Sequence, residues 1–265
     1  MKIKAFWGIL LALVLTFSLA AAEGEDQLAR IQAQGEIVIA TEGAWAPWTY
    51  HDENDVLVGF DVEVAQAIAA KLGVTAKFVE TEWDGIFAGL DSSRYDMAAN
   101  GVEITVERAQ KYDFSTPYGY IRTALIVRGD NDSITSFENL NGKRTANSIA
   151  STYMTLAESY GATAVGVDTL DQTLSMVLSG RADATLNAEV SFYDYMNVHP
   201  DANLKVVALT DEASQVAIPL RKGEDSASLR AAVDQAIAEL RDEGELTRIS
   251  EKYFGKDITA VPTEE

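Results

Sequence analysis

The feature that most constrains this chain is a regular alternation of short apolar segments with amphipathic segments that end at glycine. The first apolar segment covers residues 37–40. The amphipathic run GFDVEVAQAIAAKLG follows, in which Asp61 can cap a helix and Gly73 stands where a helix C-cap is needed. Strands that alternate with helices of this length are typical of parallel βαβ units. We therefore expect an α/β fold.

The alternation occurs in two separate stretches of the chain. The first stretch includes strand-like runs at 76–79 and 96–99, and the second restarts at 124–127. No repeat period and no low-complexity linker separates them. This pattern predicts two α/β lobes between which the chain crosses on ordered strands. A cleft between two such lobes is a natural place for a small ligand.

The N-terminus has the form of a secretory signal peptide. Lys2 and Lys4 precede an apolar run at 5–22, which ends in three alanines. A membrane anchor is the alternative, since a run of about 18 apolar residues is just long enough to span a bilayer. The A-x-A ending favours cleavage near Ala22, and no cysteine follows to carry a lipid. We expect an exported, periplasmic protein that is not a lipoprotein.

Composition excludes several classes of function. The chain has 21 Lys and Arg against 41 Asp and Glu, a formal net charge of -20, so its field repels nucleic acid. It has no Cys and 2 His, which argues against thiolate chemistry and against the usual metal sites. No G-x-S-x-G or Walker A motif occurs. We expect no nucleic-acid partner, no metal and no cofactor.

The first candidate anion site follows the run at 96–99. The stretch Asn100-Gly101-Val102-Glu103 leaves a predicted strand, and Arg108 begins a helical run. Free backbone N–H groups at such a turn, with a guanidinium one helical turn later, suit a carboxylate ligand. The alternative for Arg108 is a surface ion pair.

A second candidate anion site lies in the other predicted lobe. It covers Ser148 to Tyr153, where Ser151 and Thr152 open a helix after a strand. Ser151 alone could be a plain helix cap. The presence of one such site in each lobe, at corresponding strand ends, favours ligand binding over the alternatives.

Three tryptophans lie where predicted strand ends would face the cleft. Trp45 and Trp48 follow the first strand, and Trp83 begins a helix. A flat aromatic ring there can cover the apolar or planar part of a ligand. The alternative is core packing, which is more plausible for Trp48 and Trp83 than for Trp45.

Two polar residues, Asn187 and Glu189, follow the strand-like run at 182–186. They could hold the ammonium group of a ligand, or they could serve as helix caps. His51 and His199 have no partner in the sequence that would make either a general base.

Several segments together resemble a known family, the polar amino-acid-binding proteins of bacterial ABC importers, which include the histidine-, glutamine- and cystine-binding proteins. The resemblance covers about 26–256 and depends on TEGAWAPW, GFDVEVAQAIAAKLG, YDMAANGVEITVERAQKYDFSTPY, GRADATLNAE and ELRDEGELTRISEKYFG. It implies a type II periplasmic-binding-protein fold, with two α/β lobes joined by two crossover strands around a central cleft. After a signal peptide at 1–22, lobe 1 is expected at 23–120 plus 215–265, and lobe 2 at 121–214. Hinges are expected near 119–123 and 214–217.

The resemblance also implies roles for individual residues. Arg108 would hold the ligand α-carboxylate, assisted by the backbone N–H groups of Glu103 and Thr152. Trp45 would cover the ligand side chain, and Trp83 would line the same pocket. Backbone and amide contacts would come from Asn100, Gly101 and Val102, and the wall of lobe 2 from Ser148, Ser151 and Tyr153.

Two positions depart from the family pattern. Glu103 stands where the family has Ser or Gly, and Ala188 stands where the family has the Asp that holds the ligand ammonium. An unpaired, desolvated ammonium would cost several kcal/mol. We hypothesise that Glu103 replaces the missing Asp, with Asn187 or Glu189 as a helper. Glu103 could instead face the ligand side chain, which would favour a cationic ligand.

The resemblance implies a monomeric, non-catalytic solute-binding protein. It would capture a polar amino acid, such as cystine, glutamine or a cationic amino acid, by lobe closure, and deliver it to an ABC permease in the membrane. One alternative is a periplasmic dehydratase-like enzyme on the same fold, with Glu103 as the acid, although a second cation for a prephenate-like substrate is not evident. A second alternative, an extracellular sensor domain, is weakened because no membrane span follows the last helix.

Overall fold

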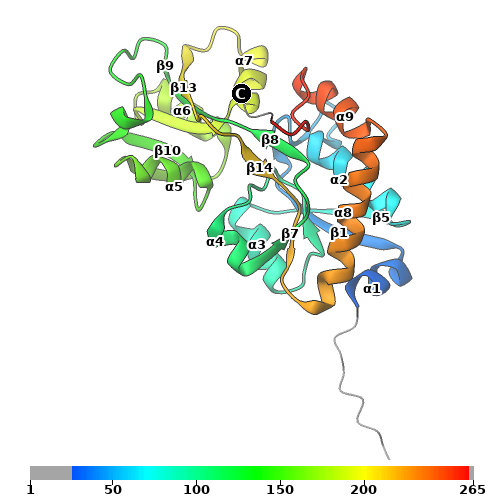
Figure 1. The fold of residues 1–265 in the computed structure, drawn as a ribbon. Helices are drawn as coiled ribbons and strands as arrows, with labels where there is room; N and C mark the ends of the chain where they lie inside the picture. The colour runs from blue at the N-terminus through cyan, green and yellow to red at the C-terminus, as the bar shows by residue number, and fades with distance from the viewer. Residues whose placement is uncertain (1–25, 263–265) are drawn as a thin grey trace, which may run out of the picture.

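The computed structural model describes residues 26–262, which form two lobes, each built around a five-stranded sheet (Figure 1). We call the lobe that contains the first strand lobe 1 and the other lobe 2. The predicted signal peptide at 1–22 lies outside the described residues. Within 26–262, no helix combines the length and the hydropathy that crossing a membrane requires.

Lobe 1 combines the first part of the chain with a segment from its last third. Its strands run in the order β5-β1-β6-β15-β7, with β1 parallel to β5 and β6, and β15 antiparallel to β6 and β7. The strands are β1 (Glu36–Thr41), β5 (Thr75–Glu80), β6 (Met97–Ala98), β7 (Tyr112–Phe114) and β15 (Pro219–Arg221). The helices of this lobe are α1 (Gln27–Gln34), α2 (Phe60–Lys71), α3 (Trp83–Asp91), α4 (Val106–Lys111), α8 (Ala227–Asp242) and α9 (Glu245–Phe254).

Lobe 2 is formed by the middle of the chain. Its strands run in the order β11-β10-β12-β9-β13, with β10 parallel to β11 and β12, and β9 antiparallel to its two neighbours. The strands are β9 (Thr123–Arg128), β10 (Arg144–Ser148), β11 (Thr163–Val167), β12 (Ala184–Ala188) and β13 (Leu204–Leu209). The helices are α5 (Thr152–Ser159), α6 (Leu170–Leu178) and α7 (Glu189–Val198).

Two short strands, β8 (Gly119–Ile121) and β14 (Ser214–Val216), cross between the lobes as an antiparallel pair (Figure 1). They lie within the two segments in which the sequence predicts hinges. The two-lobed α/β fold class is therefore confirmed, while the lobe limits of 23–120 with 215–265 and 121–214 stay a prediction. A small antiparallel sheet, β2 (Ala44–Trp45), β3 (Thr49–His51) and β4 (Leu57–Val58), extends from lobe 1 and carries Trp45.

The helix α2 illustrates how the sequence pattern gives the fold. Its buried face includes Val64, Ala65 and Ile68, which have no exposed surface, and Gly73 takes the left-handed conformation directly after the helix. The prediction that Asp61 caps this helix is wrong. Gly59 occupies the N-cap, and Asp61 lies in the first turn, where its side chain is fully buried.

Candidate ligand-binding site

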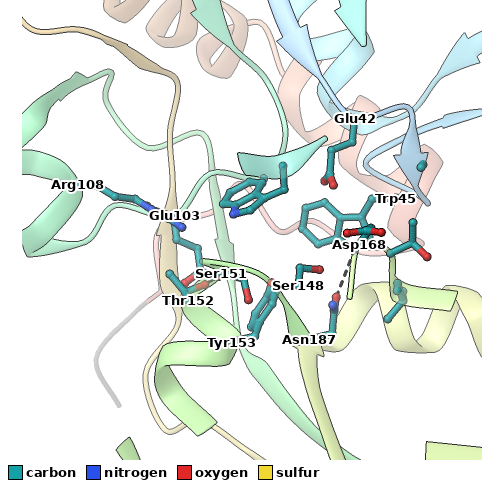
Figure 2. A pocket seen from close by; sticks show the side chains of 15 residues that line it. Glu42, Trp45, Glu103, Arg108, Ser148, Ser151, Thr152, Tyr153, Asp168 and Asn187 are labelled. Atoms are coloured by element: carbon teal, nitrogen blue, oxygen red, sulfur yellow. Dashed lines mark hydrogen bonds between the residues drawn. The ribbon is translucent and has the colours of Figure 1, made fainter. Parts of the chain in front are cut away.

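A cavity opens between the two lobes (Figure 2). Its walls come from residues that follow the carboxyl ends of strands in both sheets, as is usual for ligand sites in α/β proteins. Lobe 1 contributes Glu42, Ala44, Trp45, Trp83, Gly101, Glu103 and Arg108, and lobe 2 contributes Ser148, Ser151, Thr152, Tyr153, Asp168, Thr169, Leu170 and Asn187.

Arg108 is the only cationic side chain among the residues described as lining the cavity. It belongs to α4, whose first turn is capped by the Thr105 hydroxyl, which accepts a hydrogen bond from the Arg108 N–H at 3.1 Å. Its guanidinium donates to the Glu103 carbonyl at 3.0 Å and lies 5.1 Å from the Trp83 ring and 5.3 Å from the Phe87 ring. These contacts fix its position within a partly desolvated aromatic frame.

The Arg108 guanidinium has no carboxylate oxygen within 4.0 Å in residues 26–262. Burial lowers its pKa from the ordinary value, and the nearby Glu103 carboxyl opposes this shift. An arginine keeps its charge despite such a shift. The alternative of a surface ion pair is therefore excluded, because Arg108 offers a half-buried positive charge to the cleft without an ion-pair partner in the described residues.

Glu103 lies at the same end of the cavity as Arg108 and contacts the opposite lobe (Figure 2). Its side chain is 6% exposed, and one carboxylate oxygen accepts a hydrogen bond from the Thr152 hydroxyl at 3.0 Å. Burial raises the pKa of this carboxyl, while the hydroxyls of Ser214 and Thr152 and the charge of Arg108 oppose the rise. Glu103 therefore connects lobe 1, the crossover strand β14 and the first turn of α5.

The N-terminus of α5 forms the opposing wall. The Ser151 hydroxyl accepts a hydrogen bond from the Met154 N–H at 3.1 Å, so this side chain is a helix cap even though it lines the cavity. Tyr153 is 7% exposed, and its hydroxyl lies near the Glu103 carboxyl. Burial, and then the charge of this carboxyl, raise the pKa of Tyr153 well above its ordinary value.

The tryptophans occupy two different environments. Trp48 is fully buried, so the core-packing alternative holds for it, and it stacks on Trp45 at 5.2 Å between ring centroids. Trp45 lines the cavity and donates its indole N–H to the Asn187 side-chain oxygen in lobe 2 at 3.3 Å (Figure 2). The Trp83 indole N–H reaches the Ala150 carbonyl at 3.5 Å. Both pocket tryptophans therefore touch the opposite lobe.

Two acidic residues of the cavity were missed by the sequence analysis. Glu42 accepts a hydrogen bond from the Asn100 amide at 2.6 Å, and burial raises its pKa to about 7. Asp168 follows β11 in lobe 2. Figure 2 shows both near Trp45, away from Arg108. Each directly follows a strand, so the rule that selected Asn100 and Asn187 could have found them. The remaining lining residues, Ala44, Thr169 and Leu170, have no charged group or sequence pattern that would have marked them as site residues.

Three predicted residues do not line the cavity. Asn100 is fully buried, and its side-chain oxygen accepts from the Glu42 N–H at 2.8 Å. Val102 is fully buried, and its carbonyl accepts from the Ala217 N–H at 3.0 Å. The Glu189 carboxylate pairs with the Lys256 ammonium at 2.6 Å.

The other predicted residues, given above among the lining residues, meet in one cavity, although Gly101 directs its N–H away from it to Asp61. The Gly101 N–H is therefore not free to donate to a ligand, because it already donates to the Asp61 carboxylate. Ligand contact by each remaining residue stays a prediction.

Two α/β lobes, two crossover strands and a polar cleft, with one half-buried cation among its described lining residues, are typical of solute-binding proteins. Residues 37–256 match the family model described as bacterial extracellular solute-binding proteins, family 3. The chain belongs to this family. A probable amino-acid ABC transporter-binding protein of Haemophilus influenzae is 38% identical over 98% of this chain and 100% of its own length.

Two solved structures resemble the structure of this chain to different degrees. An ancestral arginine-binding protein bound to arginine gives a TM-score of 0.78 at 34% identity, covering 83% of this chain and 99% of its own. The L-cystine solute receptor of Neisseria gonorrhoeae, in an unliganded open conformation, gives 0.60 at 40% identity, covering 89% and 99%. The overall similarity is thus greater to the arginine-bound protein, although the L-cystine receptor has the higher sequence identity.

Proposed function

We propose that this protein captures a polar amino acid in its cleft and delivers it to an ABC permease. The observation that carries the proposal is the half-buried Arg108 guanidinium, which faces the cleft without a carboxylate partner in the described chain. The first turn of α5, which includes Tyr153, lines the same cavity from lobe 2. A guanidinium and a helix N-terminus on opposite walls suit an α-carboxylate. The related proteins named for amino acids support the same class of ligand.

The charge pattern narrows the class of amino acid. The cavity-lining side chains include one guanidinium and three carboxyl groups, those of Glu42, Glu103 and Asp168. Glu103 lies beside Arg108, whereas Glu42 and Asp168 lie toward the other end (Figure 2). Acidic groups at both ends suit a ligand with two cationic groups separated along its length. A cationic amino acid or cystine meets this condition, and glutamine, with a single ammonium group, does not.

Glu103 is our candidate for the ligand ammonium, because Ala188 cannot supply the carboxylate that the family uses there. Its position beside Arg108 supports this role, since the ammonium and carboxylate of an amino acid share one carbon atom. Asn187 can act as a helper from lobe 2, although its oxygen already accepts from Trp45. Glu189 is not a helper in this proposal, because it pairs with Lys256.

Lobe closure is the proposed mechanism. The ligand would bridge Arg108 and Glu103 of lobe 1 to the first turn of α5, and so favour the closed arrangement over the open one. We propose that the closed monomer is the form that the permease recognises. We also propose that the protein acts in the periplasm after cleavage near Ala22, and without a lipid anchor.

A dehydratase-like activity is the alternative, with Glu103 as the acid. A diacid substrate would need a second cation, and Arg108 is the only one among the residues described as lining the cavity. We therefore propose that the protein catalyses no reaction. Incubation with prephenate tests this directly, because product formation would favour the enzyme.

A thermal-shift screen tests the proposed function. L-arginine, L-lysine, L-cystine and L-glutamine would be added to the mature protein, since a ligand at 100 times its Kd adds about 2.7 kcal/mol of stability. We expect a shift with L-arginine, L-lysine or L-cystine, and a smaller one with L-glutamine. The absence of any shift with all four would contradict the proposal.

A further inference from the structure

The binding mechanism makes no use of Asp61, a fully buried carboxylate in the first turn of α2. Its side chain forms no ion pair within residues 26–262, and only two groups donate to it. The Tyr118 hydroxyl donates to one oxygen at 2.7 Å, and the Gly101 N–H donates to the other in a short contact. Burial raises the pKa of Asp61 to about 7, against these two hydrogen bonds. A buried carboxylate without a cation lowers the stability of the fold, so stability alone does not explain why Asp61 occupies this position.

The two partners of Asp61 belong to segments on opposite sides of the crossover strand β14. On one side, the pocket loop at 101–104 pairs with β14 through the Ala217 N–H to the Val102 carbonyl at 3.0 Å and the Ile104 N–H to the Gln215 carbonyl at 2.9 Å. On the other side, β8 pairs with β14.

Tyr118 immediately precedes β8, and its N–H donates to the Val216 carbonyl at 2.9 Å. The pocket loop, β14 and β8 therefore form one continuous three-stranded ribbon between the lobes. Asp61 contacts both outer segments of this ribbon, at Gly101 and at Tyr118.

The position of Gly101 also decides the shape of the cavity floor. Its φ is +56°, and a Cβ added there would lie 2.5 Å from the Trp45 ring, so only glycine fits without a shift. Two residues later the same loop carries Glu103, whose carbonyl holds the Arg108 guanidinium. A displacement of this loop would therefore move Trp45, Glu103 and Arg108 together.

We propose that Asp61 is a positioning residue that ties the pocket loop to the crossover strands, so that the geometry of the ligand site and the angle between the lobes are set together. Both partners donate to the Asp61 side chain, one at each oxygen. An amide at this position would keep one oxygen for the Gly101 N–H and turn its NH₂ toward the Tyr118 hydroxyl, which can also accept. One charge-assisted hydrogen bond would then be replaced by a neutral one of reversed direction. The proposal rests on the proposed function only for its ligand-binding readout.

Three variants separate this role from general stability. Asp61→Asn removes one of the two acceptors, and Tyr118→Phe removes one donor without changing the buried volume much. Glu63→Gln is the matched control, because Glu63 lies in the same turn of α2 but pairs with Lys252 and Arg248 of α9.

The inter-lobe distance is the readout that a merely structural role would not move. The sequence has no Cys, so Ala88→Cys in α3 and Ser175→Cys in α6, both at exposed positions, can carry a pair of spin labels without background. In ligand-free protein we expect Asp61→Asn and Tyr118→Phe to broaden the distance distribution, and Glu63→Gln to leave it unchanged.

Calorimetry with L-arginine and L-cystine gives the second readout. We expect affinity to fall about tenfold in Asp61→Asn and about threefold in Tyr118→Phe. The first value is the size expected for the loss of one charge-assisted hydrogen bond, and the second for the loss of a weaker one. If Asp61→Asn does not fold, Tyr118→Phe decides the question.

Unchanged distance distributions in folded variants would overturn the proposal, whatever the affinities. Broadened distributions in a protein that binds neither amino acid would support Asp61 as a positioning residue and count against the proposed ligands.

Discussion

The two walls of the cleft differ in chemistry. The wall from lobe 1 carries most of the charge, with Glu42, Glu103 and Arg108, and both pocket tryptophans. The wall from lobe 2 offers hydroxyls, an amide and the start of a helix, and Asp168 is the one charged side chain it contributes among the described lining residues. Under the proposed function, this difference assigns the holding of the ligand to lobe 1 and its covering to lobe 2. Substitutions in lobe 1 should then weaken capture itself, whereas substitutions in lobe 2 should mainly speed release.

The largest expected effect is that of Arg108→Met. Removing the cation leaves the ligand carboxylate buried without a partner, which costs about 3 kcal/mol of binding free energy. Calorimetry with the best amino acid from the thermal-shift screen measures the loss. Arg128→Met is the control, because Arg128 lies in lobe 2 and pairs with Asp130 at the surface. Equal affinities in the two variants would contradict the role of Arg108.

Glu103→Gln is expected to have the second-largest effect. The substitution keeps the size of the side chain but removes the charge proposed to face the ligand ammonium, which costs about 2 kcal/mol. The hydrogen bond from Thr152 can persist, since the amide oxygen still accepts. The same calorimetric titration measures the change. Unchanged affinity for the best amino acid would contradict the hypothesis that Glu103 holds the ligand ammonium.

The pH dependence of Glu42 tests the acidic end of the cavity. Because burial raises the pKa of Glu42 to about 7, the folded protein holds a proton that the unfolded chain releases between about pH 4.5 and 7. The contribution of this group to stability therefore falls as pH rises through that window. Glu42→Gln removes the titration, so its stability relative to wild type should be higher at pH 7.5 than at pH 5 by about 2 kcal/mol.

Denaturant unfolding at the two pH values measures this difference. For a ligand with a second cationic group, wild-type affinity should also rise from pH 6 to pH 8, as Glu42 ionises, and Glu42→Gln should reduce that rise. A variant whose relative stability is the same at pH 5 and 7.5 would show that Glu42 does not titrate in this range.

The smallest effect is expected from lobe 2. Thr152→Val removes the hydroxyl that donates to Glu103 across the cleft, a contact worth about 1 kcal/mol. Stopped-flow tryptophan fluorescence should show faster ligand release with little change in the association rate. Thr155→Val is the control on the same helix, because its hydroxyl bonds only to the Ser151 carbonyl. A slower association rate in Thr152→Val would contradict the division of roles between the lobes.

The fold could be predicted from local signals together with the family resemblance. Gly73 ends α2 in the left-handed conformation, as the sequence pattern predicts, and the two strands between the lobes lie within the predicted hinge segments. Asp61 shows where local reasoning fails. Its acidic side chain at a helix start has the pattern of a cap, but its partners are residues 40 and 57 positions away. No periodicity in the sequence reports contacts of that kind.

The candidate site was predicted less completely than the fold. The cation and the hydroxyls were found because they stand next to predicted strand ends or helix starts, and the cavity gathers them. Glu42 was missed because its acidic side chain precedes a loop whose tryptophans drew the functional interpretation. Glu189 was assigned to the site because it follows β12, but its carboxylate pairs with Lys256, 67 residues later in the chain. Such a pairing depends on where the C-terminal segment lies.

The most direct test of the central claim compares an amino acid with its methyl ester. Calorimetry would titrate the best-binding L-amino acid, and then its ester, into wild-type protein and into Arg108→Met. If Arg108 holds the α-carboxylate, the ester binds wild type at least about 100-fold more weakly than the acid, and the two bind Arg108→Met with similar low affinity. Equal binding of acid and ester by wild type, or full affinity for the acid in Arg108→Met, would contradict the account.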